Sequence, residues 1–163
     1  MSRLHHAFCL FICCAFIAGC QGPSADELFK QGEEATHHVD QYPLAEVKLA
    51  EFLDHYPNDP RADIALQALA RVLMNQNKGD EAIARYEALL RQYPQSRYSP
   101  QAQFMIGYIC DQAGQFDKAR VAYQKVIETY PQSDLVDDAQ ISIQNMGKSP
   151  ELWLLPALAD SSK

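Results

Sequence analysis

The feature that most constrains how this chain can fold is a tetrapeptide that returns at a fixed interval. Tyr93-Pro94-Gln95-Ser96 recurs as Tyr130-Pro131-Gln132-Ser133, and a weaker form, Tyr56-Pro57-Asn58-Asp59, comes before it; each interval is 37 residues. The segments between the tetrads align along their whole length. Tandem copies of one structural unit produce this self-similarity. We therefore interpret the tetrads as the boundaries of repeated units.

Each interval carries the pattern of two helices joined by a turn. In the middle unit, Asp59-Pro60 is expected to start a helix that stops at the turn around residues 77–79. Asp80 then starts a second helix that ends at Tyr93, and its charge suits the first helical turn. Pro94 ends this helix because the residue before a proline is biased away from helical geometry. Adding 37 to each position reproduces the pattern in the third unit.

The two ends of the repeat region are less regular. Ser24 and Glu27 have capping-box spacing, which predicts a first helix running to about His38, and Pro43 is expected to be the first residue of the next helix. A final helix from Asp134 to about Met146 has no second helix after it. The sequence thus predicts an all-α solenoid over residues 24–147. Its helix-turn-helix units are residues 24–57, 58–94 and 95–131, followed by a terminal capping helix at 133–147.

The repeats resemble tetratricopeptide repeats. The third unit has the small residues at helix crossings, the aromatic residue near the turn and the closing proline of that pattern, at Gly107, Gly114, Phe116, Ala119, Tyr123 and Pro131. Ala82, Tyr86 and Pro94 match in the second unit, and Ala45 and Pro57 in the first. The tetrads resemble a longer variant of the repeat found in two envelope lipoprotein families. These are the BamD component of the outer-membrane β-barrel assembly machinery and the YbgF/CpoB partner of the Tol-Pal system.

The resemblance implies a partner-binding groove on the concave side of the solenoid, formed by the first helix of each unit. The family's groove positions correspond here to Ile64, Gln67, Arg71, Met74, Asn75, Gln101, Phe104, Tyr108, Asp111 and Gln112. In the first unit they correspond to Lys30, Glu34, His37 and His38. Apolar and aromatic groups beside an arginine and several amides suit an extended or helical peptide. The alternative interpretation makes Ile64 and Phe104 core residues of a narrow stack.

The first twenty residues are expected to lie outside the fold. Arg3 gives a positive start, and the uncharged, mostly apolar residues 7–18 are typical of a signal-peptide core and too few to span a bilayer. Ile17-Ala18-Gly19-Cys20 resembles a bacterial lipobox, which implies cleavage of residues 1–19 and lipidation of Cys20. Gln21, which is not aspartate, favours the outer membrane of a Gram-negative bacterium, with residues 20–23 as a short linker. Ordinary secretion with another cleavage site is the alternative.

Charge and cysteine usage exclude several classes of function. The 163 residues have a formal net charge of −7, which becomes −8 when residues 1–19 are removed. This charge argues against nucleic-acid binding and against attraction to anionic lipid, so membrane residence is expected to depend on the Cys20 lipid. Of five cysteines, only Cys110 lies beyond Cys20, which excludes an intramolecular disulfide. We interpret Cys110 as a small buried apolar residue.

The sequence shows no pattern for catalysis or for a metal. It has no phosphate loop, nucleophile elbow or paired-carboxylate arrangement, so no catalytic residue and no cofactor is predicted. His37-His38 could suggest a metal site, but neighbours on a helix point about 100° apart. Glu33 and Glu34 offer them ordinary ion pairs instead. We therefore predict solvated histidines and no metal site.

The C-terminal tail, residues 148–163, can form a short helix that starts at Ser149-Pro150 and ends at Pro156. We interpret it as a lid over the last helix, and a segment that touches a partner or the membrane through Trp153 is the alternative.

The lipobox and the repeats together predict a non-enzymatic, lipid-anchored periplasmic scaffold. Its partners are envelope proteins or extended peptides, and the BamD-like resemblance implies a role in outer-membrane protein assembly. A role with Tol-Pal, in cell-wall synthesis or in pilus or secretion assembly is the first alternative. A cell-wall enzyme or a metal carrier that uses the histidines is an alternative of another class.

Overall fold

The computed structural model describes residues 22–148 as a row of α-helices with one short 3-10 turn and no strand among these residues. The elements are α1 (Ala25–Ala35), η1 (Val39–Gln41), α2 (Tyr42–His55), α3 (Ala62–Asn75), α4 (Gly79–Gln92), α5 (Ser99–Gln112), α6 (Phe116–Thr129) and α7 (Leu135–Asn145). The predicted all-α repeat fold is confirmed. The predicted signal peptide, Cys20 and the tail from residue 149 onward lie outside the described residues.

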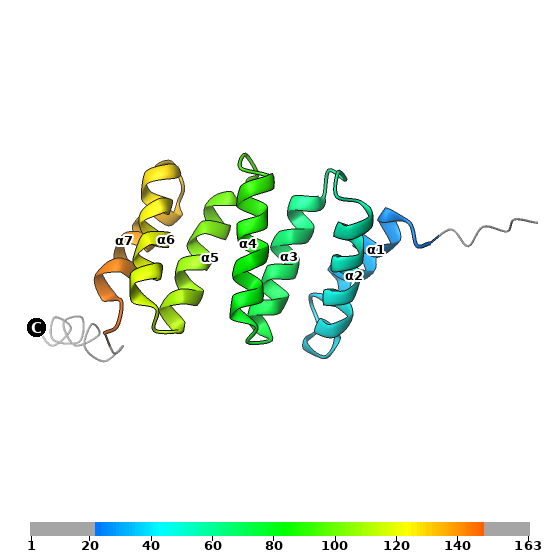
Figure 1. Ribbon diagram of the computed structural model, residues 1–163, viewed down its shortest axis with the longest axis horizontal. Helices are drawn as coiled ribbons and strands as arrows, with labels where there is room; N and C mark the ends of the chain where they lie inside the picture. Colours follow the sequence, from blue (N-terminus) through cyan, green and yellow to red (C-terminus); the bar gives the residue numbers. More distant parts are fainter. Residues whose placement is uncertain (1–21, 149–163) are drawn as a thin grey trace, which may run out of the picture.

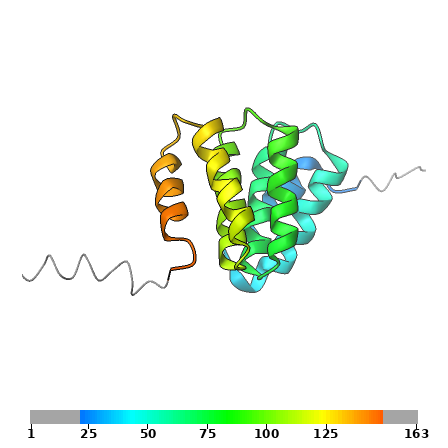
Figure 2. The ribbon, with the colours of Figure 1, turned by 60° about the vertical axis from the view of Figure 1, so that its left-hand side comes forward.

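Successive helices pack as antiparallel pairs, and the pairs stack side by side in chain order (Figure 1). The second helices α2, α4 and α6 form one layer, and the first helices α1, α3, α5 and α7 form the other (Figures 1 and 2). α1 and α7 lie at opposite ends of the row. Because one pair cannot bury its apolar face alone, the stacked pairs share a continuous core.

Small residues on the first helices let the two helices of a pair approach closely. A Cβ atom at Gly107 would lie 2.7 Å from the ring of Tyr123, and one at Gly32 would lie 2.8 Å from the side chain of Leu49. Leu49, Tyr86 and Tyr123 occupy the same repeat position, and all are fully buried. The pairing of a small residue on the first helix with a large one on the second is therefore what sets the crossing distance.

The three tetrads adopt one and the same turn. The tyrosine that ends each second helix has φ of −129°, −130° and −125° at Tyr56, Tyr93 and Tyr130. The fourth residue of each tetrad accepts a hydrogen bond from the backbone N–H two residues later, at 2.9, 3.1 and 3.2 Å. Asp and Ser side chains commonly form such turns, so Asp59 serves here in the place of Ser96 and Ser133. The tetrads are structural boundaries.

Two of the tetrad tyrosines also make long-range hydrogen bonds, one between units and one within the first unit. The hydroxyl of Tyr93 donates to the carbonyl oxygen of Pro57 at 2.8 Å, and that of Tyr56 donates to the carbonyl oxygen of Pro23 at 3.0 Å. The Tyr93 bond joins the end of the second helix pair to the turn that closes the first pair, whereas the Tyr56 bond joins the end of the first pair to the segment that precedes the same pair. Tyr93 therefore holds two neighbouring units in register, and Tyr56 fixes the N-terminal segment of its own unit.

Helix boundaries differ from the predictions in three places. α1 ends at Ala35, not near His38, because Thr36 donates its hydroxyl to the Glu33 carbonyl at 2.8 Å and the chain turns into η1. α3 begins at Ala62, not at Asp59-Pro60, because the Asp59 carboxylate closes a turn on the Arg61 N–H. Ser24 caps α1 as predicted, with its hydroxyl 3.2 Å from the Glu27 nitrogen. Pro43 is the second residue of α2 and not the first.

Asp59 holds the start of α3 through an ion pair with Arg61. Arg61 donates from Nε and Nη2 to the two carboxylate oxygens of Asp59, each at 2.8 Å. These hydrogen bonds lower the pKa of Asp59 from 3.8 to about 2. A carboxyl group whose pKa is lowered by folding stabilises the fold above its unfolded-state pKa, and this contribution is lost as the pH falls through the folded-state pKa.

Asp59→Asn is therefore expected to lower the free energy of unfolding at neutral pH by roughly 1–2 kcal/mol. The difference from the parent chain should shrink as the pH falls from about 4 to about 2, because Asp59 is protonated first in the unfolded state and then, near its lowered pKa, in the folded state as well. Urea unfolding followed by circular dichroism across this range measures it. Asp54→Asn, which changes an exposed carboxylate on α2, is the control and should have little effect. A deficit of constant size across the whole range would contradict the ion-pair account.

Candidate functional site

A pocket of about 660 Å³ lies between the second and third units, and we call it the inner pocket. α3 and α5 contribute Met74, Asn75, Tyr108 and Gln112 to it, and the turns that follow these helices contribute Asn77 and Gln115. Its size is within the usual range of ligand-binding pockets. The α3–α4 and α5–α6 turns thus bring the C-terminal ends of two first helices to one cavity.

Four of the ten groove residues predicted by resemblance line the inner pocket. They are Met74, Asn75, Tyr108 and Gln112. Tyr108 is 41% exposed. Asn75 is fixed by the first unit, since its Nδ2 donates to the Tyr42 hydroxyl at 3.0 Å. The structure therefore brings an aromatic ring, a thioether and two amide side chains to one accessible surface.

Three further predicted residues lie on the first helices but not at the inner pocket. Arg71 is exposed and donates from Nη2 to the Thr36 hydroxyl at 3.4 Å, so it is held near the first unit. Gln101 is exposed in the first turn of α5. Asp111 is half-buried, and burial raises the pKa of its carboxyl group. A partner that reached these residues would extend beyond the inner pocket along the first-helix layer.

The remaining three predicted residues face the core to different degrees. Ile64 and Phe104 are half-buried and pack against core clusters, with the Phe104 ring 5.2 Å from that of Tyr123. Gln67 is only 9% exposed, so its assignment to an exposed groove is wrong. It lies among the buried residues of α3, where helix α3 is enclosed on most sides by α2 and α4.

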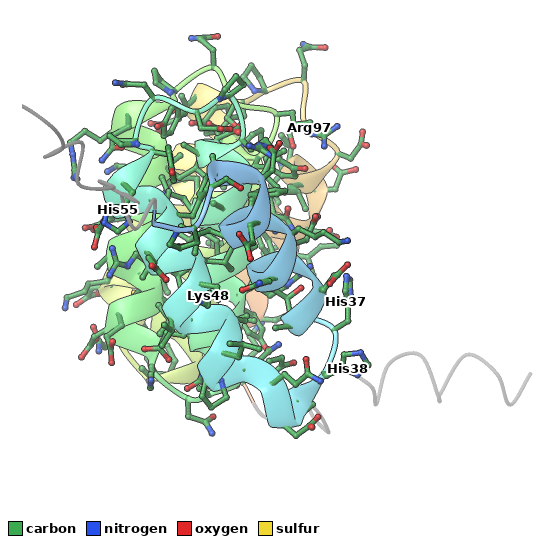
Figure 3. The ribbon with its side chains drawn as sticks, turned by 90° about the vertical axis from the view of Figure 1, so that its right-hand side faces the viewer. His37, His38, Lys48, His55 and Arg97 are labelled. Carbon is green, nitrogen blue, oxygen red and sulfur yellow. The ribbon has the colours of Figure 1, made fainter. Side chains whose placement is uncertain are left out.

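The first unit presents polar, solvent-facing side chains. Lys30 and Glu34 form an exposed ion pair at 3.9 Å. His37 and His38 are both exposed, and Figure 3 shows them projecting from the edge of the molecule at the end of α1. Within residues 22–148, no group of three or more His, Cys, Asp or Glu side chains is placed to hold a metal ion.

Cys110 lies beneath the inner pocket, 3% exposed, as the sequence predicted for a small buried apolar residue. Burial raises the pKa of its thiol. The thiol therefore stays protonated near neutral pH, and a protonated thiol is a poor nucleophile. The pocket offers recognition chemistry instead: side-chain amides can pair with the N–H and C=O groups of a peptide backbone, while Met74 and Ile83 supply apolar contact.

Sequence reasoning missed the pocket residues that come from turns and second helices. These include Asn77, Ile83 and Gln115. The groove positions of the family lie on first helices only, so an assignment based on the family resemblance could not include residues from turns or second helices. A usable signal existed: Gln115 and Ile83 stand, one period later, where the first two units carry Lys78 and Glu46. A change of that kind between repeats marks a place where the repeats differ in function or packing.

The stacked helix pairs and the accessible first-helix layer define a helical-repeat scaffold for protein–protein interaction. The chain belongs to the family described as tetratricopeptide repeat-like domain, whose profile matches residues 31–148. A comparison with curated proteins gave no significant match. Among residues 22–148, no helix is both long enough and apolar enough to cross a membrane.

Proposed function

We propose that this protein is a non-enzymatic scaffold, anchored by a lipid on Cys20 to the periplasmic face of the outer membrane, where it binds an envelope protein. The process it serves in this proposal is outer-membrane protein assembly. The observation that carries the proposal is the inner pocket, in which four groove residues of a tetratricopeptide-type repeat gather on one surface. The resemblance of the 37-residue repeats to the BamD variant supplies the process.

The position of the fold along the chain supports a site close to the bilayer. α1 begins at Ala25, only a few residues after the lipobox cysteine. A linker of four residues reaches at most about 13–14 Å. Two or more acyl chains would hold the protein stably, and the acidic repeat domain would add no attraction of its own. A partner bound at the inner pocket would therefore be held near the membrane surface.

The pocket favours a peptide segment as the bound element. Met74 and the Tyr108 ring offer apolar contact, and Asn75 and Gln112 offer amide donors and acceptors. An extended peptide segment can use both kinds of contact at once, because it exposes side chains for apolar contact and backbone N–H and C=O groups for hydrogen bonding. An exposed aromatic residue in a pocket is also the type of side chain that most often dominates binding energy.

Photo-crosslinking in intact cells tests this proposal. A photoreactive amino acid in place of Tyr108 in the full chain is expected to give an adduct with one envelope protein. The same amino acid in place of Asp54, which is exposed on α2 away from the pocket, should give none. An Asn75→Ala/Gln112→Ala background should weaken the Tyr108 adduct about tenfold or more, as loss of hot-spot contacts would.

The identity of the trapped protein decides the process. A subunit or substrate of the β-barrel assembly machinery would support the proposal, whereas a Tol-Pal or cell-wall protein would move the scaffold to that system. Absence of any adduct at Tyr108, with the variant present at normal abundance, would refute a partner at the inner pocket.

A further inference from the structure

A second pocket, of about 530 Å³, opens on the second-helix side of the same junction, and we call it the outer groove. α5 lies between α4 and α6 in the row (Figure 1) and provides the floor, Ile106 and Cys110. Ile83 of α4 and Val121 of α6 form the walls. Val121 is 57% exposed, so an apolar wall of this groove faces solvent.

The repeat itself supplies a comparison, because the junction between the first and second units has the same construction. There, Lys78 and Glu46 form an ion pair at 2.7 Å. One period later these two positions are Gln115 and Ile83, which line the outer groove. The first junction is thus closed by a side-chain bridge, and the second replaces that bridge with an amide and an apolar side chain.

The floor of the outer groove is also less completely covered than the equivalent residues at the first junction. At the first junction the positions equivalent to Ile106 and Cys110 are Leu69 and Leu73, which are 1% and 2% exposed. Ile106 is only half-buried, whereas Cys110 is 3% exposed and differs from Leu73 in having a smaller side chain. At the second junction, apolar surface is exposed that is buried at the first. Such exposure is expected where a binding partner covers the surface.

The rim of the outer groove is acidic. Asp80 and Glu87 on α4 and Asp117 on α6 surround it, with Lys118 as the single basic group. None of the ion pairs found within residues 22–148 involves these four side chains. Carboxylates around an apolar groove favour a basic ligand and disfavour an acidic one.

We propose that the outer groove is a docking site for an amphipathic peptide segment of another protein, which inserts an apolar side chain between Ile83 and Val121 and places lysine or arginine at the acidic rim. The bound side chain covers the half-buried Ile106 of the floor, whose counterpart at the first junction, Leu69, is already buried. This proposal depends on the proposed function in one respect only, that the protein is a scaffold that binds other proteins. The two pockets share Asp80, Ile83, Cys110 and Gln115, but the outer groove alone includes Glu87, Asp117 and Val121 of the second helices, and it requires its own ligand.

Two synthetic helical peptides are the probes. They share one pair of leucines four residues apart, and the leucines are flanked by lysines in one peptide and by glutamates in the other. Fluorescence anisotropy with the full chain purified in detergent is expected to show at least about tenfold tighter binding of the lysine peptide. Glu87→Lys/Asp117→Lys should reverse this preference, since both residues line the outer groove and not the inner pocket.

A matched control separates the groove from general electrostatics. Glu81→Lys/Glu128→Lys makes the same change in net charge on the same two helices, at exposed positions outside both pockets. It should change binding of the lysine peptide less than about threefold. A closing variant, Ile83→Glu/Gln115→Lys, copies the bridge of the first junction and should bind neither peptide while unfolding at a temperature close to the parent's. Because Ile83 and Gln115 also line the inner pocket, this result counts for the outer groove only together with that of Glu87→Lys/Asp117→Lys, whose positions line the outer groove alone.

Several results would overturn the proposal. Equal binding of both peptides, an equal loss in the matched control, or full binding by the closing variant each excludes a specific groove. Self-association of the parent chain that Glu87→Lys/Asp117→Lys removes would assign the groove to a second copy of the chain. Failure here leaves the Tyr108 adduct in cells intact, whereas failure of the proposed function removes that adduct and leaves lysine-peptide binding unchanged.

Discussion

Gly107→Val should unfold roughly 10 °C below the parent chain in a thermal melt, the largest loss of stability expected from a single added side chain here. A Cβ atom at this position would lie 2.7 Å from the Tyr123 ring, closer than packed atoms can approach. Neither neighbour can move freely, because Gly107 is inside α5 and Tyr123 is 1% exposed. The helix pair must separate, which costs roughly 3 kcal/mol for three extra carbon atoms in a packed site.

The control for this change is Ala84→Val, which places valine at an exposed position of α4. It measures the helix propensity of valine alone and should cost about 0.5 kcal/mol. In the Tyr123→Leu background, Gly107→Val should be less harmful, because a smaller side chain faces the new methyl groups. A melting temperature for Gly107→Val within about 2 °C of the parent would show that the α5–α6 crossing is not set by this contact.

Cys20→Ser is expected to abolish lipid attachment completely, the largest functional effect predicted for this protein. The sulfur is the acceptor that the lipobox resemblance implies, and a serine hydroxyl cannot form the same thioether. Without acyl chains the domain would gain no attraction to anionic lipid from its own surface, because its net charge is negative. Incorporation of radiolabelled palmitate in growing cells is the measurement, with density-gradient separation of the two membranes.

Cys110→Ser is the matched control, since Cys110 is the only other cysteine beyond residue 19. Its thiol is 3% exposed in the fold and cannot reach an acyl donor, so the label should persist in this variant. The gradient readout matters because an uncleaved Cys20→Ser precursor can stay in the inner membrane through its apolar residues 7–18. Palmitate on Cys20→Ser chains, or none on the parent, would refute the lipobox assignment.

The repeat period allowed most of the fold to be predicted. Three copies of one turn, with Asp59 or serine at the fourth position, impose the same hydrogen bond and the same tyrosine geometry each time. Because helix pairs of equal length must then stack, the all-α architecture follows from spacing alone. The buried state of Cys110 also follows from its helical position, whereas the exposed His37 and His38 lie in the turn after α1.

The features that sequence reasoning missed depend on contacts between units. α1 stops early because the Thr36 hydroxyl captures the Glu33 carbonyl, a local competition that helical periodicity does not register. Gln67 is buried because α3 is enclosed by neighbouring helices on most sides, whereas a single-helix pattern places glutamine toward solvent. The inner pocket includes Asn77 and Gln115 because two turns from different units meet there. Such residues become neighbours only after stacking.

The hydrogen bonds and ion pairs between units also make the bending stiffness of the solenoid uneven. Within residues 22–148, the first and second units are joined by Arg61–Asp26, Lys78–Glu46, Asn75–Tyr42, Arg71–Thr36 and Tyr93–Pro57. Between the second and third units, two polar links are present, Ser96–Asp63 and Ser99–Tyr93, and neither is an ion pair. Polar bonds resist shear between stacked helices more than apolar surfaces do. The curvature of the solenoid is therefore expected to vary mainly at the junction between the second and third units. The first two units would then move as one rigid body, and the units after them could adjust to partners of different width.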